Sequence, residues 1–224
     1  MEHNANVIDR SPSSIIEINK VLRNTYLLLG MTLVFSGITA YISAAFALPV
    51  PRGITGMLIM LAGFYGLLFA IEKTKESGMG LVLTFVFTGF MGYILGPIIG
   101  YVSANAPQIL MTALGGTGLT FFGLSAYVLL TRKDMSFLSG TLTAGFIVIM
   151  LAVVANIFLQ IPAFSLAISA AFILFSSMII LWQTSAIIHG GERNYISATV
   201  TLFVSIYNIF TSLLHILLAF AGDD

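Results

Sequence analysis

The residues of this chain that could do chemistry are a serine in a glycine-marked motif, three histidines and nine acids. The motif "GLSA", Gly123 to Ala126, resembles the nucleophile motif of intramembrane serine proteases, with His215 as the base it would require. The helical rise places Ser125 about 8 Å from one end of its apolar segment and His215 about 28 Å from that end of its own. A nucleophile and its base must approach within about 3 Å. The separation of about 20 Å therefore argues against serine proteolysis.

The acids and histidines argue against two other kinds of catalytic site. Aspartyl proteolysis within a membrane needs two embedded carboxylates, whereas every acid here lies in a tail or in a loop between apolar segments. Zinc needs three or four clustered ligands, and His3, His189 and His215 fall in different parts of the predicted topology. The chain has no cysteine, and no lysine follows the glycines of "LGGTGL" to bind a phosphate. We expect no catalytic residue, no metal and no cofactor.

The composition indicates the environment in which the remaining residues act. Of the 224 residues, 58% are hydrophobic and 8% are charged, with a mean hydropathy of +1.02. Soluble domains have about 45–50% apolar and about 25% charged residues, so this is the composition of an integral membrane protein. Nine basic residues balance nine acidic ones, which leaves no basic field for nucleic acid. The polar N-terminus differs from a signal peptide, so we expect the first apolar segment to be retained.

Seven apolar segments have the length of a membrane span, which is about 20 residues for a bilayer core about 30 Å thick. They run from Thr25 to Leu48, Ile54 to Ile71, Gly80 to Val102, Gln108 to Leu130, Phe137 to Leu159, Phe164 to Ile188 and Ile196 to Phe220. The sequence therefore predicts an all-α polytopic membrane protein with one seven-helix domain over residues 25–220. An N-terminal tail of residues 1–24 precedes it, and a short tail of residues 221–224 follows.

Lysine and arginine gather on one side of these spans, as they do in loops that face the cytoplasm. Only Arg52 lies on the other side. The eight on the first side are Arg10, Lys20, Arg23, Lys73, Lys75, Arg132, Lys133 and Arg193. We therefore expect a cytoplasmic N-terminus and, because the number of crossings is odd, a C-terminus on the periplasmic side.

Small and polar residues inside the spans indicate how the helices pack. Gly92, Gly96 and Gly100 recur at four-residue spacing on one face of the third span, which also contains Pro97. Such small residues let helix backbones approach closely in a membrane. We expect this helix to be kinked and tightly packed.

Polar side chains follow one face of the last span along its whole length, at steps of four and three residues. They are Thr201, Ser205, Asn208, Ser212 and His215. Polar groups within a membrane turn towards other helices or a watered cavity, so this helix is expected to be central. The sixth span has a matching line that ends at Gln183, at a depth similar to that of Ser205. A polar contact between these two side chains is predicted, although serine also bonds to its own helix.

Several stretches together resemble the Bax inhibitor 1 family of seven-helix membrane proteins. They include "FTGFMGYILGPII", "TRKDMSFLSG" and "LWQTSAIIHGGERNYISATVTLFVSIYNIF", and the match extends over nearly the whole chain. The last two are most similar to the bacterial inner-membrane, YccA-type branch, whose members bind the ATP-dependent membrane protease FtsH. The resemblance implies a last helix surrounded by the other six. It also implies an inner-membrane regulator that restrains the proteolysis of membrane proteins by FtsH, with no catalysis of its own.

Another part of the family acts as a pH-sensitive calcium leak that uses paired acids on the sixth and seventh helices. Aligned with that motif, Gln183 and Ser205 occupy the positions of the two acids, and Asn208 that of a nearby amide. An amide and a hydroxyl do not titrate near neutral pH, and they offer calcium less charge than two carboxylates. A leak is therefore the disfavoured alternative.

The N-terminal tail is the segment that a cytoplasmic protease could grip. It is the longest segment outside the spans on the side where such a protease works, and Ile15, Glu17 and Lys20 are the candidate contacts. A purely structural scaffold in the membrane is the remaining alternative, and it predicts no effect when the residues before Lys20 are removed.

Overall fold

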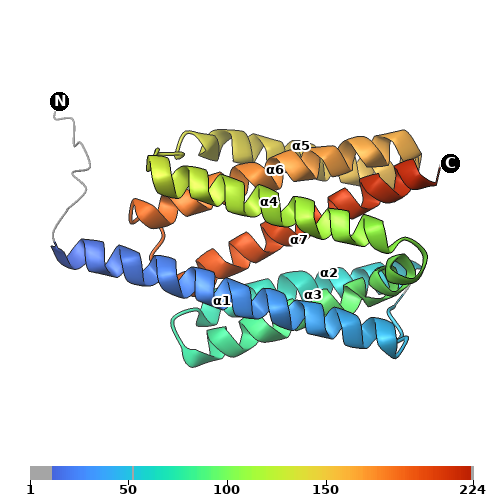
Figure 1. Cartoon of the computed structure of the whole chain (residues 1–224), viewed down its shortest axis with the longest axis horizontal. Helices are drawn as coiled ribbons and strands as arrows, with labels where there is room; N and C mark the ends of the chain where they lie inside the picture. Colours follow the sequence, from blue (N-terminus) through green and yellow to red (C-terminus); the bar gives the residue numbers. More distant parts are fainter. Residues whose placement is uncertain (1–11, 52, 223–224) are drawn as a thin grey trace.

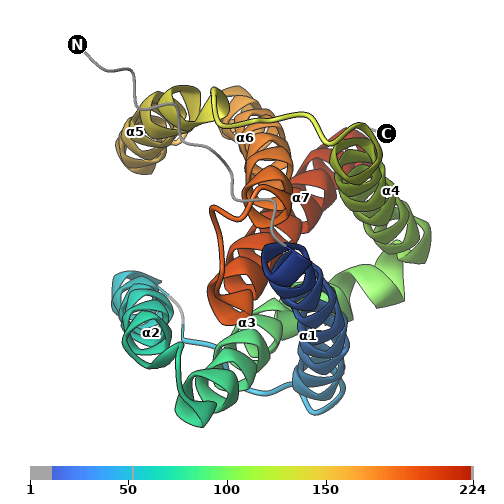
Figure 2. The same ribbon diagram turned by 90° about the vertical axis from the view of Figure 1, so that its left-hand side faces the viewer.

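The fold is a bundle of seven helices, seen in a computed structural model that describes residues 12–51 and 53–222 (Figures 1 and 2). The helices of this described part are α1 (Pro12–Ala45), α2 (Gly53–Thr74), α3 (Gly78–Asn105), α4 (Pro107–Thr131), α5 (Leu138–Leu159), α6 (Pro162–Ile188) and α7 (Tyr195–Ala221). All seven are long and apolar enough to cross a membrane. His3, Arg10, Arg52, Asp223 and Asp224 lie outside the described residues.

The first helix starts earlier than the sequence indicated. Helix α1 begins at Pro12 rather than Thr25, so the second half of the predicted tail is helical and not a loose segment. Proline suits the first position of a helix, and no other helix breaker occurs before Gly30. With 34 residues α1 is about 50 Å long, well beyond the thickness of a bilayer core. Its first turns extend past the other helices (Figure 1). All other span boundaries agree with the prediction to within three residues.

Helix α7 lies at the centre of the bundle, which confirms the predicted position of the last helix (Figure 2). It packs on α6, α4, α1 and α3, and α2 joins it through the main apolar cluster around Phe87 and Phe203. Helix α5 packs extensively only on α6, and a single residue of it, Ile149, is buried. Most of the large apolar side chains of α5 are exposed, and a bilayer would surround them.

The closest helix pair is α1 with α3, and it uses the glycine face of the third span. A side chain at Gly92 would overlap with the backbone of Ser36, and one at Gly96 would overlap with Ser43. The Ser43 hydroxyl also donates a hydrogen bond of 2.9 Å to the carbonyl oxygen of Tyr93. The two backbones approach closely because α3 has no side chain at Gly92 or Gly96. Pro97 is accommodated within α3.

The described lysines and arginines all lie at the end of the bundle where α1 begins, which we call the basic end (left in Figure 1). They are Lys20, Arg23, Lys73, Lys75, Arg132, Lys133 and Arg193. The loops α2–α3, α4–α5 and α6–α7 meet there, and the remaining loops lie at the opposite end. Because such charges mark cytoplasmic loops, we propose that the basic end faces the cytoplasm.

Candidate functional site

Gln183 and Ser205 are both buried in the half of the bundle near the basic end, with exposed fractions of 2% and 1%. No hydrogen bond joins these two side chains in the described part of the chain, and for Ser205 the alternative of a bond within its own helix is the one observed. The Ser205 hydroxyl donates to the carbonyl oxygen of Thr201, one turn back in its own helix, at 2.8 Å. The amide nitrogen of Gln183 has no hydrogen-bond partner among the described residues. A serine inside a helix reaches its own backbone more easily than a neighbouring helix.

The other members of the polar stripe on α7 differ in their surroundings. Ser212 is buried, whereas Thr201 and Asn208 are half-buried. His215 has an exposed ring, but its Nδ1 is hydrogen-bonded to the hydroxyl of Ser169 on α6 at 2.8 Å. The stripe therefore contacts α6 directly at the end opposite the basic end.

Several further polar atoms are buried without a hydrogen-bond partner in the described part of the chain. They are the hydroxyls of Thr25, Tyr26, Ser125, Ser176 and Thr184 and the amide oxygen of Asn156. Leaving a buried polar group unpaired costs about 1–3 kcal/mol. Ser125 lacks the base that a nucleophile would need, and His215 is bonded to Ser169 instead. The structure thus gives no support to the serine-protease geometry.

A polar network at the basic end was not visible in the sequence, because its members belong to different loops. Buried Ser185 near the end of α6 accepts a 2.9 Å hydrogen bond from the backbone N–H of Met135 and donates one of 3.3 Å to the carbonyl oxygen of Lys133. Asn194 caps α7 through the backbone N–H groups of Ile196 and Ser197, and its amide nitrogen donates to the carbonyl oxygen of Lys75 at 3.0 Å. These bonds join loops α4–α5 and α2–α3 to the end of α6 and the start of α7.

Two acidic side chains at the basic end, Glu72 and Asp134, accept hydrogen bonds from residues close to them in the sequence. Lys75 donates to Glu72, and this hydrogen bond raises the pKa of Lys75. The backbone N–H of Ser136 donates to Asp134 at 2.8 Å and holds the pKa of that carboxyl below its usual value. Among the described residues no cluster of three or more histidines and acids could hold a metal ion. The basic end therefore offers hydrogen-bonded loops and, among the described residues, one ion pair at its surface.

The predicted protease contacts lie on the projecting start of α1. The side chains of Glu17 and Lys20 are exposed, and that of neighbouring Ile16 is 70% exposed. For Ile15 the structure describes the backbone only, which is helical. Val21 is buried against Ile187 and Ala198, so this helix is attached to the bundle immediately after the exposed residues.

Comparison with known proteins agrees with this architecture. The sequence profile of the family described as "Inhibitor of apoptosis-promoting Bax1" matches residues 18–222. The "Modulator of FtsH protease YccA" of Escherichia coli strain K12 is 57% identical over 213 residues, which cover 95% of this chain and 95% of that protein. The "Inner membrane protein YccA" of Escherichia coli O6:H1 gives the same identity and coverage. An uncharacterized protein of Pseudomonas aeruginosa is 57% identical over 210 residues, or 93% of both chains.

The family match begins within α1, at residue 18, and continues through the end of α7. The similarity to inner-membrane relatives and the seven apolar helices make this chain a multi-pass inner-membrane protein. It belongs to the Bax inhibitor 1 family, the "Inhibitor of apoptosis-promoting Bax1" group, and resembles the YccA proteins within it.

Proposed function

We propose that this chain binds the membrane protease FtsH and restrains its degradation of membrane proteins. The observation that carries the proposal is the 57% identity, over 95% of both chains, to a protein named as a modulator of FtsH protease. At that level of identity the same helices and the same exposed segments are expected in both proteins. The chain would act as a regulator through binding rather than through chemistry of its own.

The mechanism that we favour is occupancy of the protease. The α1–α3 contact leaves no room for a methyl group at Gly92 or Gly96, and α7 is enclosed by four helices. A bundle packed in this way resists extraction, so it stays with the protease longer than an ordinary substrate does. The exposed turns around Glu17 and Lys20, on the proposed cytoplasmic side, supply a segment for the protease to engage.

Copurification and substrate decay test this proposal. A tagged form of the chain should co-isolate FtsH from bacterial membranes, and raising its level should slow the decay of a membrane-embedded FtsH substrate. A soluble FtsH substrate followed in the same cells separates restraint of membrane proteolysis from general loss of the protease. If the tagged chain brings down no FtsH and the membrane substrate decays at its usual rate, the proposal is wrong.

For the alternative leak activity we expect a negative result in calcium-loaded proteoliposomes. Between about pH 6 and pH 8 the flux should not change with pH, because Gln183 and Ser205 do not titrate there. It should stay near that of empty vesicles, because these two side chains offer calcium less charge than two carboxylates. The histidines of the described part of the chain are His189 and His215. A pH-dependent flux would contradict the expectation, and its loss in His215→Gln but not His189→Gln would locate the titrating group at the far end of α7.

A further inference from the structure

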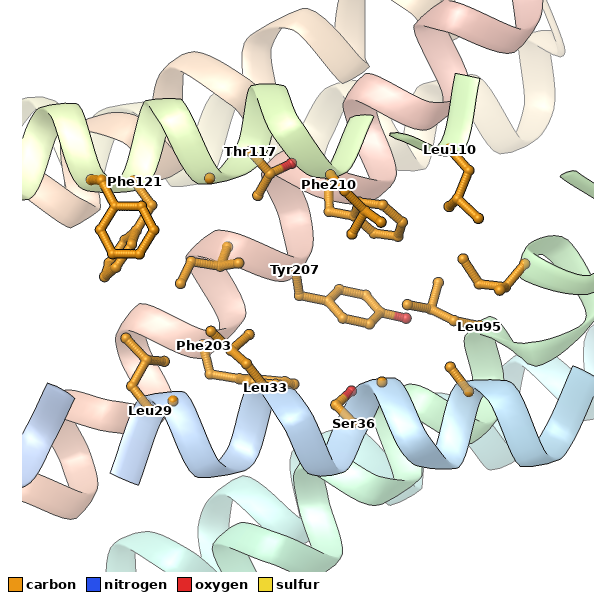
Figure 3. Close-up of a pocket in the computed structure, with 18 of the residues that line it drawn as sticks. Leu29, Leu33, Ser36, Leu95, Leu110, Thr117, Phe121, Phe203, Tyr207 and Phe210 are labelled. Carbon is orange, nitrogen blue, oxygen red and sulfur yellow. The ribbon is translucent and has the colours of Figure 1, made fainter. Parts of the chain in front are cut away.

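A cavity of about 490 Å³ lies between α1, α3, α4 and α7, away from the polar stripe (Figure 3). Its floor is the aromatic face of α7, formed by Phe203, Tyr207 and Phe210. Leu29 and Leu33 of α1 face Phe121 of α4 across it. We call this space the α1/α4 cleft.

The cleft opens sideways, between α1 and α4, rather than towards either end of the bundle. Gly30 and Gly37 of α1 and Phe122 of α4 line it and are exposed. A side chain built at Gly30 or Gly37 would meet no atom within 4 Å. Each of the two flanking helices packs on α7, and the two stand apart in Figure 2. In a membrane this opening faces the hydrocarbon of the bilayer.

The lining is suited to hydrocarbon and not to a headgroup, an ion or water. No charged residue lines the cleft, and its polar members are Tyr26, Ser36, Thr117 and Tyr207. The Thr117 hydroxyl donates to the carbonyl oxygen of Ala113 at 2.7 Å, and the Tyr26 hydroxyl is buried. A site for water needs two to four polar partners. One of the four hydroxyl groups is already bonded within its own helix, and the other fifteen of the nineteen lining residues are apolar or glycine, so the cleft suits an apolar occupant.

The dimensions indicate the shape of that occupant. Its lining residues run from Tyr26 to Ala40 on α1 and from Leu110 to Phe122 on α4, which corresponds to a length of about 20 Å. A methylene group is close in size to a water molecule, so a space of this volume holds a chain of several methylene groups. A helix with side chains is about 10 Å across and over this length would need roughly three times the volume of the cleft. A single chain fits, whereas a transmembrane helix could only lie across the opening.

We propose that the α1/α4 cleft binds one acyl chain of a membrane phospholipid, which enters sideways from the bilayer. The bilayer supplies this ligand directly at the opening. Both environments are apolar, so the gain is van der Waals contact with the aromatic floor in place of an unfilled space. The bound chain thereby couples α1, the helix that carries the exposed protease-contact candidates, to α4 and α7.

Quenching of tryptophan fluorescence by brominated acyl chains tests this site. Trp182 is the single tryptophan of the chain, so Trp182→Phe provides a silent background. A Tyr207→Trp reporter in that background should be quenched in vesicles of phospholipids brominated along the acyl chain. The comparison reporters are Leu119→Trp, which is 79% exposed on α4, and Phe87→Trp, which is fully buried. We expect quenching close to that of the Leu119 position and well above that of the Phe87 position.

A blocking variant shows whether the quencher is inside the cleft. Gly37→Phe should lower quenching of the Tyr207→Trp reporter by about twofold or more, because the ring would fill the space. Gly66→Phe is the matched control, since Gly66 is exposed on α2 with no atom near it. Should Tyr207→Trp misfold, Phe210→Trp reports on the same floor. Quenching no stronger than at the Phe87 position, or unaffected by Gly37→Phe, overturns the proposal.

Discussion

Replacing Gly92 with leucine should destabilise the bundle more than any other single change considered above. The first atom of the new side chain would overlap with the carbonyl group of Ser36 and with Thr39 on α1. Those are backbone atoms and a side chain held by its own hydrogen bond to Ser36, so neither can move aside cheaply. Overpacking of a close helix contact costs about 3 kcal/mol or more when backbone must shift. We expect loss of most folded protein from membranes.

Substitutions at other glycines separate the effect of the α1–α3 clash from the effect of replacing a glycine in a helix. At Gly100 an added methyl group would lie 3.3 Å from the side chain of Ala44, so Gly100→Ala should cost little. Gly66→Leu and Gly115→Leu introduce the same side chain where no atom lies within 4 Å. These two should be neutral or slightly stabilising, because leucine favours helix more than glycine does.

The midpoint of thermal unfolding in detergent, followed for the whole series, gives the required comparison. The order from least to most stable should be Gly92→Leu, Gly96→Leu, Gly100→Ala and then the two outer variants. Equal midpoints for Gly92→Leu and Gly66→Leu would mean that α1 does not lie against this face of α3.

Removing residues 1–19 should abolish most of the restraint on FtsH while leaving the bundle folded. The deletion takes away exposed Ile16 and Glu17 and leaves Val21 in its contact with Ile187 and Ala198. Lys20 and Arg23 also remain, so the charge bias that orients the first span is kept. The copy number needed to slow decay of a membrane substrate should rise about tenfold or more, as expected when about 1.4 kcal/mol of contact energy is lost.

A charge-reversed form of the full chain tests the same segment without shortening it. Glu17→Lys combined with Lys20→Glu keeps the helix length, its composition and the net charge. A drop in restraint in this variant would show that the contact depends on the side chains, and its thermal midpoint should match that of the unaltered chain. If the truncated chain restrains FtsH fully, the projecting turns of α1 are not the contact. That result would favour the alternative of a purely structural scaffold.

For the polar residues of α7, the sequence predicted their positions on one helix face but not their hydrogen-bond partners. The stripe on α7 was visible as a periodic pattern, and the structure places its buried members inside the bundle. The hydrogen-bond partner of each residue could not be predicted from the sequence, because a serine hydroxyl can bond to a carbonyl of its own helix or to a group on a neighbouring helix. Ser205 does the former, while His215 reaches Ser169 on another helix.

The sequence by itself determined the number of spans, the distribution of basic residues and membership in the family. The first two properties follow from local composition, because a span is recognised by the length of its apolar run and orientation by the basic residues beside it. Membership in the family follows from the order of the motifs along the chain. The early start of α1 was missed, because a polar segment without breakers can be helix or tail depending on whether its inner face is anchored, as Val21 is here.

Only the tertiary structure decided which faces meet. In a bilayer the lipid-facing and buried sides of a helix are both apolar, so periodicity of hydrophobic residues cannot separate them. The glycine face of α3 could have met any helix, and the crossing of α1 selected it. The same crossing leaves α1 and α4 apart over the aromatic floor of α7, which creates the α1/α4 cleft. Such a space arises from the relative tilt of whole helices, and no local pattern in the chain encodes it.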